Sequence, residues 1–376
     1  MAKKKTNRKS KKLDMKIKLP KGARYKVDVP PELFTLPMSM LIHGRPGSGK
    51  SVLAYNIIKK YQQAGLCDRV IMVSPTAQSN SALKEDLGIA DEDIFLPTDK
   101  TVPAKITQIV EDERDEFERD LDRQEDYRKF GAQLRSGKSV YEIEDDLWLQ
   151  FTDESGELVK KPEMKYKNSV GGRPQLFTIW DDCIASPVWE KSQAFLNYTT
   201  RQRHLGSMTY DPRHRSGQKV GALGMSNLYL IHSLKCERGG LPKLVRQNAF
   251  QIAIVNNTAN KKELQSLCEA CSGQCDEDVF YNLFKKSQQK DHDSFIVDFL
   301  NRKKDHPSMF RRNLDEFLIP DKSVTYASSV PEKKKKKRGR KADKVSKAEQ
   351  RRLAAAEQPS PNDLAVDNVN VQKKIC

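Results

Sequence analysis

Short apolar runs alternate with amphipathic stretches along most of the chain. The apolar runs are rich in branched and aromatic residues, which is typical of buried strands. They cover residues 38–42, 68–75, 176–180, 226–233, 249–257 and 293–300. The stretches at residues 50–63, 187–200, 261–271 and 276–290 have the periodicity of helices. Strands that alternate with helices in this way predict an α/β fold with a doubly wound, mostly parallel sheet.

A long, heavily charged segment interrupts this alternation. Residues 102–134 predict one helix whose middle mixes both signs of charge with sparse apolar residues. Such a composition is typical of an exposed arm or hairpin rather than of a core helix. Residues 136–174 are rich in loop-forming residues. We therefore expect residues 102–174 to be an insertion in a larger domain that spans residues 29–320.

A phosphate-loop motif directly follows the first predicted strand. Residues 44–51 read GRPGSGKS and match the G-x-x-x-x-G-K-[ST] spacing. The glycines let backbone N–H groups curl around the β- and γ-phosphates, and the following helix directs the positive end of its dipole at them. Lys50 is expected to reach these phosphates, and the Ser51 hydroxyl to bind Mg²⁺. The residues expected to bind nucleotide are Gly44, Arg45, Pro46, Gly47, Ser48, Gly49, Lys50 and Ser51.

A pair of acids ends the third predicted strand. The run LFTIWDD places Asp181 and Asp182 at the carboxyl end of that strand, the edge at which open α/β sheets bind ligands. We expect Asp181 to hold Mg²⁺ and Asp182 to be the catalytic base that activates water. The alternative is that both acids only cap the next helix. Together with the phosphate loop, the pair predicts a P-loop NTPase of RecA/ASCE-like type that hydrolyses ATP.

Later segments carry further polar candidates. Ser233 ends the fourth predicted strand and is a candidate sensor of the γ-phosphate. Arg246, in the run LPKLVRQN, is a candidate catalytic arginine that reaches the nucleotide of an adjacent subunit. The alternative is an arginine on the surface or in contact with DNA. Two basic stretches, at residues 199–207 and 213–215, are predicted to sense nucleotide or to line a DNA channel.

The net charge of the chain is +16, and it is concentrated near the two ends. Residues 1–28 carry a net charge of +10 and residues 331–352 a net charge of +9, so the remainder is slightly acidic, at −3. Basic ends of this kind are typical of solvated arms that bind polyanions by releasing counterions. We expect the N-terminal arm, residues 1–28, and the low-complexity tail, residues 321–376, to be disordered.

The C-terminal tail allows three interpretations. The run PEKKKKKRGRK is a plausible nuclear import signal. Arg338 and Arg340 flank a glycine and are candidates for DNA binding, because two arginines spaced in this way can enter a narrow minor groove. The third interpretation is a solubilising tail without a fixed partner.

Composition excludes some classes of protein and leaves one metal question open. No segment reaches the roughly 18 continuous apolar residues that a membrane span needs, and no apolar run follows the basic N-terminus as in a secretory signal. The odd number of cysteines, 7, fits a reducing compartment. Cys268, Cys271 and Cys275 have spacing similar to that of zinc ligands, with Cys236 or His232 as a fourth candidate. The alternative is that these cysteines pack on one face of a helix.

The order of these motifs resembles that of the genome-packaging ATPases of the FtsK–HerA lineage, from poxviruses, other large DNA viruses, virophages and Polinton-like elements. The resemblance covers about residues 36–300. It implies a homo-oligomeric, hexameric ring that binds ATP and Mg²⁺ and drives double-stranded DNA into a capsid, with capsid proteins as further partners. It also implies the roles given above for Lys50, Ser51, Asp181, Asp182 and Arg246. Members of this lineage commonly have Gln where this chain has His232 and Ser233.

A DNA-translocating ATPase in an infected host cell is therefore the leading hypothesis, located in the nucleus or a viral factory, or associated with the virion. A DNA helicase of the same superfamily would share every catalytic residue. A nucleotide-gated DNA-binding or partition protein would hydrolyse ATP slowly, as a switch. A nucleotide kinase ranks last, because no acceptor pocket or lid is recognisable in the sequence.

Overall fold

The computed structural model describes residues 29–77, 81–136, 145–152, 173–190, 192–208, 221–234, 240–256, 259–300 and 309–319, with residues 27, 142, 143, 165, 325 and 326. For residues 81–83, 325 and 326 it describes the backbone alone. The predicted roles of Arg338, Arg340, Cys236 and residues 213–215 lie outside these residues, as do residues 331–352 and all of residues 1–28 except Val27.

A single sheet organises the described residues, and its ten strands have the order β10-β9-β8-β7-β6-β1-β5-β4-β2-β3. The strands are β1 (Ser39–His43), β2 (Arg69–Val73), β3 (Ile94–Phe95), β4 (Leu176–Asp181), β5 (Ser226–Ile231), β6 (Gln251–Val255), β7 (Ser294–Asp298), β8 (Phe310–Arg312), β9 (Glu316–Leu318) and β10 (Thr325–Tyr326). Neighbours from β6 to β3 pair in parallel. The pairs from β6·β7 to β9·β10 are antiparallel.

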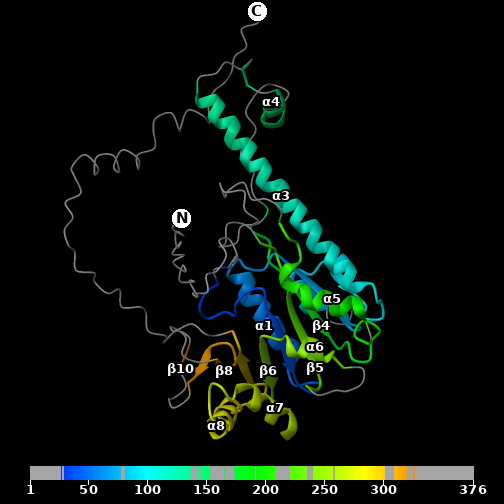
Figure 1. Cartoon of the computed structure of the whole chain (residues 1–376), viewed down its shortest axis with the longest axis vertical. Helices are drawn as coiled ribbons and strands as arrows, with labels where there is room; N and C mark the ends of the chain where they lie inside the picture. The colour runs from blue at the N-terminus through cyan, green and yellow to red at the C-terminus, as the bar shows by residue number, and fades with distance from the viewer. Residues whose placement is uncertain are drawn as a thin grey trace, which may run out of the picture.

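Helices cover both faces of this sheet (Figure 1). The α-helices are α1 (Lys50–Gln63), α2 (Ser81–Leu87), α3 (Val102–Arg135), α4 (Asp145–Phe151), α5 (Gln193–Arg201), α6 (Lys243–Gln247), α7 (Lys261–Cys271) and α8 (Glu277–Ser287). Two 3₁₀ turns, η2 (Asp91–Asp93) and η4 (Gln202–His204), lie between them. Helix α1 packs on one face of the parallel strands, whereas α3 and α5 pack on the other. The fold is therefore α/β and doubly wound, as predicted.

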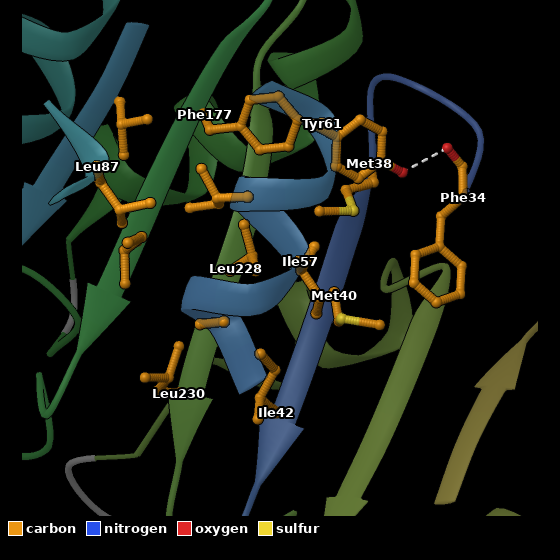
Figure 2. Packing of buried hydrophobic residues seen from close by; sticks show 14 of the residues in the cluster. Phe34, Met38, Met40, Ile42, Ile57, Tyr61, Leu87, Phe177, Leu228 and Leu230 are labelled. Atoms are coloured by element: carbon orange, nitrogen blue, oxygen red, sulfur yellow. Dashed lines mark hydrogen bonds between the residues drawn. The ribbon is translucent and has the colours of Figure 1, made fainter. Parts of the chain in front are cut away.

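Burial on both faces explains the continuous apolar runs of the central strands. Every residue of β1, β4 and β5 is buried. Alternate residues of β1 face opposite layers, so Met40 and Ile42 pack with Ile57 and Tyr61 of α1 (Figure 2). Tyr61 also donates a hydrogen bond of 2.6 Å to the carbonyl of Phe34, which fixes the chain that leads into β1.

The structure corrects two details of the sequence prediction. The sixth predicted strand, residues 293–300, forms β7, but it runs antiparallel to β6 and opens an antiparallel edge of short strands. The helix expected over residues 187–200 begins later, at Gln193, because Ser192 caps it by accepting a hydrogen bond from the Phe195 amide.

The long charged helix is also different from the expectation. Its first half is not an exposed arm, since Val102, Ile106, Val110 and Phe117 are fully buried against the sheet. These residues recur at intervals near four or seven, so they form one narrow apolar stripe on an otherwise charged helix. The second half of α3 extends away from the sheet and packs against α4 through a small separate cluster (Figure 1).

The packing of the cysteine cluster agrees with the second interpretation of the sequence, in which the cysteines pack on one face of a helix. Cys268 and Cys271 are buried on the face of α7 that packs toward α8, and Cys275 lies at the edge of the same cluster. Among the described residues, no group of three or more His, Cys, Asp or Glu side chains could hold a metal ion. No described helix is long and apolar enough to cross a membrane.

Candidate functional site

The loop from β1 to α1 has the conformation that phosphate binding requires. Gly47 and Gly49 have positive φ values, of 75° and 99°, which side chains other than glycine rarely adopt. A Cβ at Gly44 would lie 2.2 Å from Ser48 Oγ and 2.9 Å from the Lys50 side chain. The loop therefore closes tightly over its own backbone, and it ends at the N-terminus of α1, where a helix attracts anions.

Lys50 is folded back over this loop. Its ammonium group donates hydrogen bonds to the carbonyls of Gly44 at 2.8 Å and Arg45 at 3.2 Å. Burial lowers the pKa of Lys50, while the charges of Asp181 and Asp182 act in the opposite direction. The lysine thus stands at the mouth of the loop as a buried cation that lacks a carboxylate in direct contact among the described residues.

The two predicted acids occupy different environments at the end of β4. Asp181 is the last residue of the strand and is buried, and this burial raises the pKa of its carboxyl although the charge of Lys50 lowers it. Asp182 has a φ of 49° and an exposed side chain. This left-handed turn separates the two carboxylates, one toward the protein and one toward solvent.

His232 joins these groups into one site, although sequence reasoning had selected its neighbour. Strand β5 lies between β1 and β4, and His232 follows it. Its Nδ1 lies 3.4 Å from Lys50 Nζ, and its Nε2 lies 3.2 Å from Asp182 Oδ1. Since the lysine donates, Nδ1 accepts and Nε2–H donates to the carboxylate. Ser233, the predicted sensor, instead donates a hydrogen bond of 2.6 Å to Glu263 of α7.

A buried layer of polar side chains lies directly beneath the site. His43, the last residue of β1, is 1% exposed and donates from Nε2 to the His232 carbonyl at 3.1 Å. The same nitrogen lies 3.7 Å from Glu263 Oε2. Within the described residues, His43 Nδ1 has no hydrogen-bond partner. This arrangement fits a neutral imidazole with its proton on Nε2.

His43 should make stability depend on pH. Burial lowers its pKa below the ordinary value of 6.5, although the nearby charge of Glu263 opposes this effect. The unfolded chain therefore binds a proton to His43 before the folded protein does, and the free energy of unfolding should decrease as the pH falls below about 6.5. Melting curves at pH 7.5 and pH 5.5 should show this decrease, and His43→Gln, which keeps an N–H donor, should make it smaller. An equal decrease in both proteins would contradict the assignment.

An open cavity of about 840 Å³ adjoins the phosphate loop. The loop and the exposed side of α1 form one wall, including Val52 and Asn56. The segment before β7 and the turn between β8 and β9 form the other, including His292 and Leu314. His292 Nδ1 lies 2.9 Å from the carbonyl of Ser48 and so ties this second wall to the loop. The antiparallel edge thus supplies half of the cavity.

The candidate arginines contact other parts of the chain than the phosphate loop. Arg246 of α6 is half-buried and donates a hydrogen bond to the carbonyl of Leu234 within its own chain. Arg203 stacks on the ring of Phe250, with its guanidinium carbon 5.2 Å from the ring centre. The expected role of Arg246 at a neighbouring subunit stays a prediction.

The strand order and the site together define the fold class. The parallel strands have the order β6-β1-β5-β4-β2, so one strand separates β1, which leads into the phosphate loop, from β4, which carries the acids. This is the predicted P-loop NTPase fold of RecA/ASCE-like type.

Comparison with known proteins gives similarity in structure only. No protein-family model matches the chain, and no curated protein is similar to it in sequence. The genome packaging NTPase B204 from Sulfolobus turreted icosahedral virus 2, in complex with ATP-gammaS, is 12% identical over 74% of this chain and 97% of its own, with a TM-score of 0.35. The same NTPase in complex with AMPPCP is also 12% identical over 74% of this chain and 97% of its own, with a TM-score of 0.33. The pCW3 conjugation coupling protein TcpA with ATPgS is 11% identical over 58% of this chain and 48% of its own, with a TM-score of 0.27. These similarities are too weak to assign a function.

Proposed function

We propose that this chain is an ATPase that couples hydrolysis to the movement of double-stranded DNA and packages a viral genome into a capsid. The main support for the proposal is that side chains from the segments after three different strands lie together at the phosphate loop. Lys50 follows β1, Asp182 follows β4 and His232 follows β5, and hydrogen bonds through the His232 ring link all three. A cation, a carboxylate and a sensor at one phosphate loop are the components that ATP hydrolysis needs.

The phosphate loop and the cavity would bind different parts of the nucleotide. The backbone N–H groups from Gly44 to Ser51 would hold the β- and γ-phosphates, with Lys50 neutralising their charge. The base and ribose would extend into the cavity beside α1, whose volume of about 840 Å³ exceeds the need of one nucleoside. Val52 and Leu314 offer apolar contacts on opposite walls of that cavity.

Hydrolysis then requires an attack by water on the γ-phosphorus. The water oxygen forms the new bond to phosphorus, the bond from phosphorus to the β–γ bridging oxygen breaks, and ADP leaves with that electron pair. Asp182 would accept the proton of the water, since its carboxylate is exposed toward the site. His232 stands between Lys50 and Asp182 and would contact the γ-phosphate.

Magnesium fits the oxygen donors that the site offers. Mg²⁺ typically takes one or two protein oxygens and completes its shell with phosphate and water. The Ser51 hydroxyl at the start of α1 and the buried Asp181 carboxylate would supply those two oxygens. When bound, the ion would neutralise charge on the phosphates, and its charge would favour an ionised Asp181.

The coupling to DNA is supported by charge and by the resemblance in motif order. Residues 1–28 and 331–352 together carry +19, whereas the remainder of the chain carries −3. Such arms would hold the phosphate backbone without reading sequence, as a packaging motor requires. An oligomeric ring would place Arg246 of one subunit near the nucleotide of the next.

Steady-state ATP hydrolysis with and without long double-stranded DNA tests this proposal. Duplex DNA should stimulate turnover by at least about fivefold, a typical size for coupling between two sites. Displacement of a triplex-forming strand from the same duplex would then report translocation. Hydrolysis that ignores DNA would contradict the motor, and strand separation on a forked duplex would identify a helicase instead.

A further inference from the structure

Side chains from two elements, β1 and α7, hold the three residues that follow β5. We call His232, Ser233 and Leu234 the post-β5 segment. His43 donates to the carbonyl of the first residue at 3.1 Å. Glu263 accepts from the hydroxyl of the second at 2.6 Å and from the backbone N–H of the third at 2.7 Å. The segment is therefore fixed along its whole length, although it belongs to no helix or strand.

Glu263 contributes most to this arrangement. It lies in the first turn of α7, is 2% exposed, and uses both carboxylate oxygens. Burial raises the pKa of its carboxyl, but hydrogen bonds from Ser233 and from the backbone of Asn260 and Leu234 outweigh that effect and lower the pKa. Glu263 is thus a buried carboxylate that is held in its charged form by the groups it binds.

The capping box of α7 uses only one of the two carboxylate oxygens of Glu263. Asn260 and Glu263 form this box, in which Oε2 of Glu263 accepts from the Asn260 backbone at 3.0 Å. The other oxygen, Oε1, forms both bonds to the post-β5 segment. A residue that only stabilised the helix would not need that second set of bonds.

We propose that Glu263 is a positioning residue for nucleotide hydrolysis, which holds the post-β5 segment so that the His232 ring stands between Lys50 and Asp182. This inference rests on the proposed function, because it assigns His232 to the γ-phosphate. Glu263 touches neither Lys50 nor Asp182 and acts through Ser233 and Leu234, the two residues that follow His232. Loss of its carboxylate would free Ser233 and Leu234, and the imidazole of His232 would lose part of the support that holds it over the phosphate loop.

Measurements of nucleotide affinity distinguish a positioning role of Glu263 from a role in helix stability alone. The ratio of the dissociation constants for ADP and ATPγS measures the contact with the γ-phosphate and needs neither hydrolysis nor DNA. Glu263→Ala should reduce this ratio by about tenfold and leave the affinity for ADP within about twofold, because the loop itself is unchanged. Turnover should fall by about 10- to 100-fold, as expected when a reacting group is misplaced by about 1 Å.

Asn260→Ala is the matched control. It removes the other half of the same capping box and should lower the melting temperature to a similar degree, but it leaves both bonds from Glu263 to the post-β5 segment. Its affinity ratio and turnover should stay close to those of the unaltered chain. An Asn260→Ala variant that loses as much discrimination as Glu263→Ala would overturn the positioning role.

A double mutant shows whether Glu263 acts through His232. In a chain that already carries His232→Ala, the further change Glu263→Ala should have almost no effect on the affinity ratio. Additive effects would overturn the inference. A chain that binds ATPγS with these effects but hydrolyses no ATP would contradict the proposed function alone. A chain in which neither variant changes the ratio, or which binds no ATPγS, would overturn the inference itself.

Discussion

Replacing Lys50 by alanine should lower ATP turnover by at least about 100-fold, the usual cost of losing a donor that stabilises charge developing in the transition state. The ammonium group is buried at the mouth of the loop, where phosphates would replace its present bonds to the carbonyls of Gly44 and Arg45. Because the effect is electrostatic, affinity for ATP should decrease as well. Steady-state hydrolysis and titration with a fluorescent ATP analogue would measure both.

Lys59 provides a control on the same helix. It is also a lysine of α1, but it lies on the surface in an ion pair with Asp86, which contributes little to stability. Lys59→Ala should therefore retain normal turnover. Turnover near normal in the Lys50 variant would mean that the loop does not hold the reacting phosphate, and the assignment of an ATPase would be wrong.

Replacing Asp182 by asparagine should lower turnover by about 100- to 1,000-fold with a small change in KM, because it removes the proton acceptor but not the binding site. Asparagine tolerates the left-handed backbone at this position, where φ is 49°, and its side-chain oxygen can still accept the hydrogen bond from His232. The variant therefore tests the effect of the negative charge of Asp182 alone.

Glu190→Gln removes a negative charge from an exposed position in the turns that follow β4, so it tests for a general effect of charge. It should leave turnover unchanged. If Asp182→Asn behaved like this control, the base would have to be another group, and Asp182 would serve only to orient His232.

The sequence was sufficient to predict the central sheet and the phosphate loop because both are local patterns. Buried strands give continuous apolar runs, and the loop has a fixed spacing of glycine and lysine. The antiparallel edge was missed because β8 and β9 have three residues each, too few for a periodic pattern. The core half of α3 was missed because its apolar stripe is diluted by charged residues on the other faces of the same helix.

Side-chain direction explains why Ser233 was selected in place of His232. Successive residues of an extended chain point to opposite sides, so one of this pair reaches the phosphate loop and the other reaches α7. The sequence alone does not show which of the two side chains reaches the phosphate loop. Glu263 was missed for a different reason, since its partner Ser233 lies 30 residues away and nothing local marks the pair.

Helix α3 is buried against the sheet along its first half and extends beyond the sheet along its second half, and this has a mechanical consequence. Its 34 residues span ~50 Å at ~1.5 Å per residue, and the buried half, up to Leu121, packs in the same core cluster as residues of β4, the strand that carries the acids. A rotation of about 5° at Leu121, where the buried half ends, would move the distal end, near α4, by ~2 Å over the remaining ~21 Å. A small rotation at the point where the helix leaves the sheet therefore becomes a displacement of ångströms at its distal end.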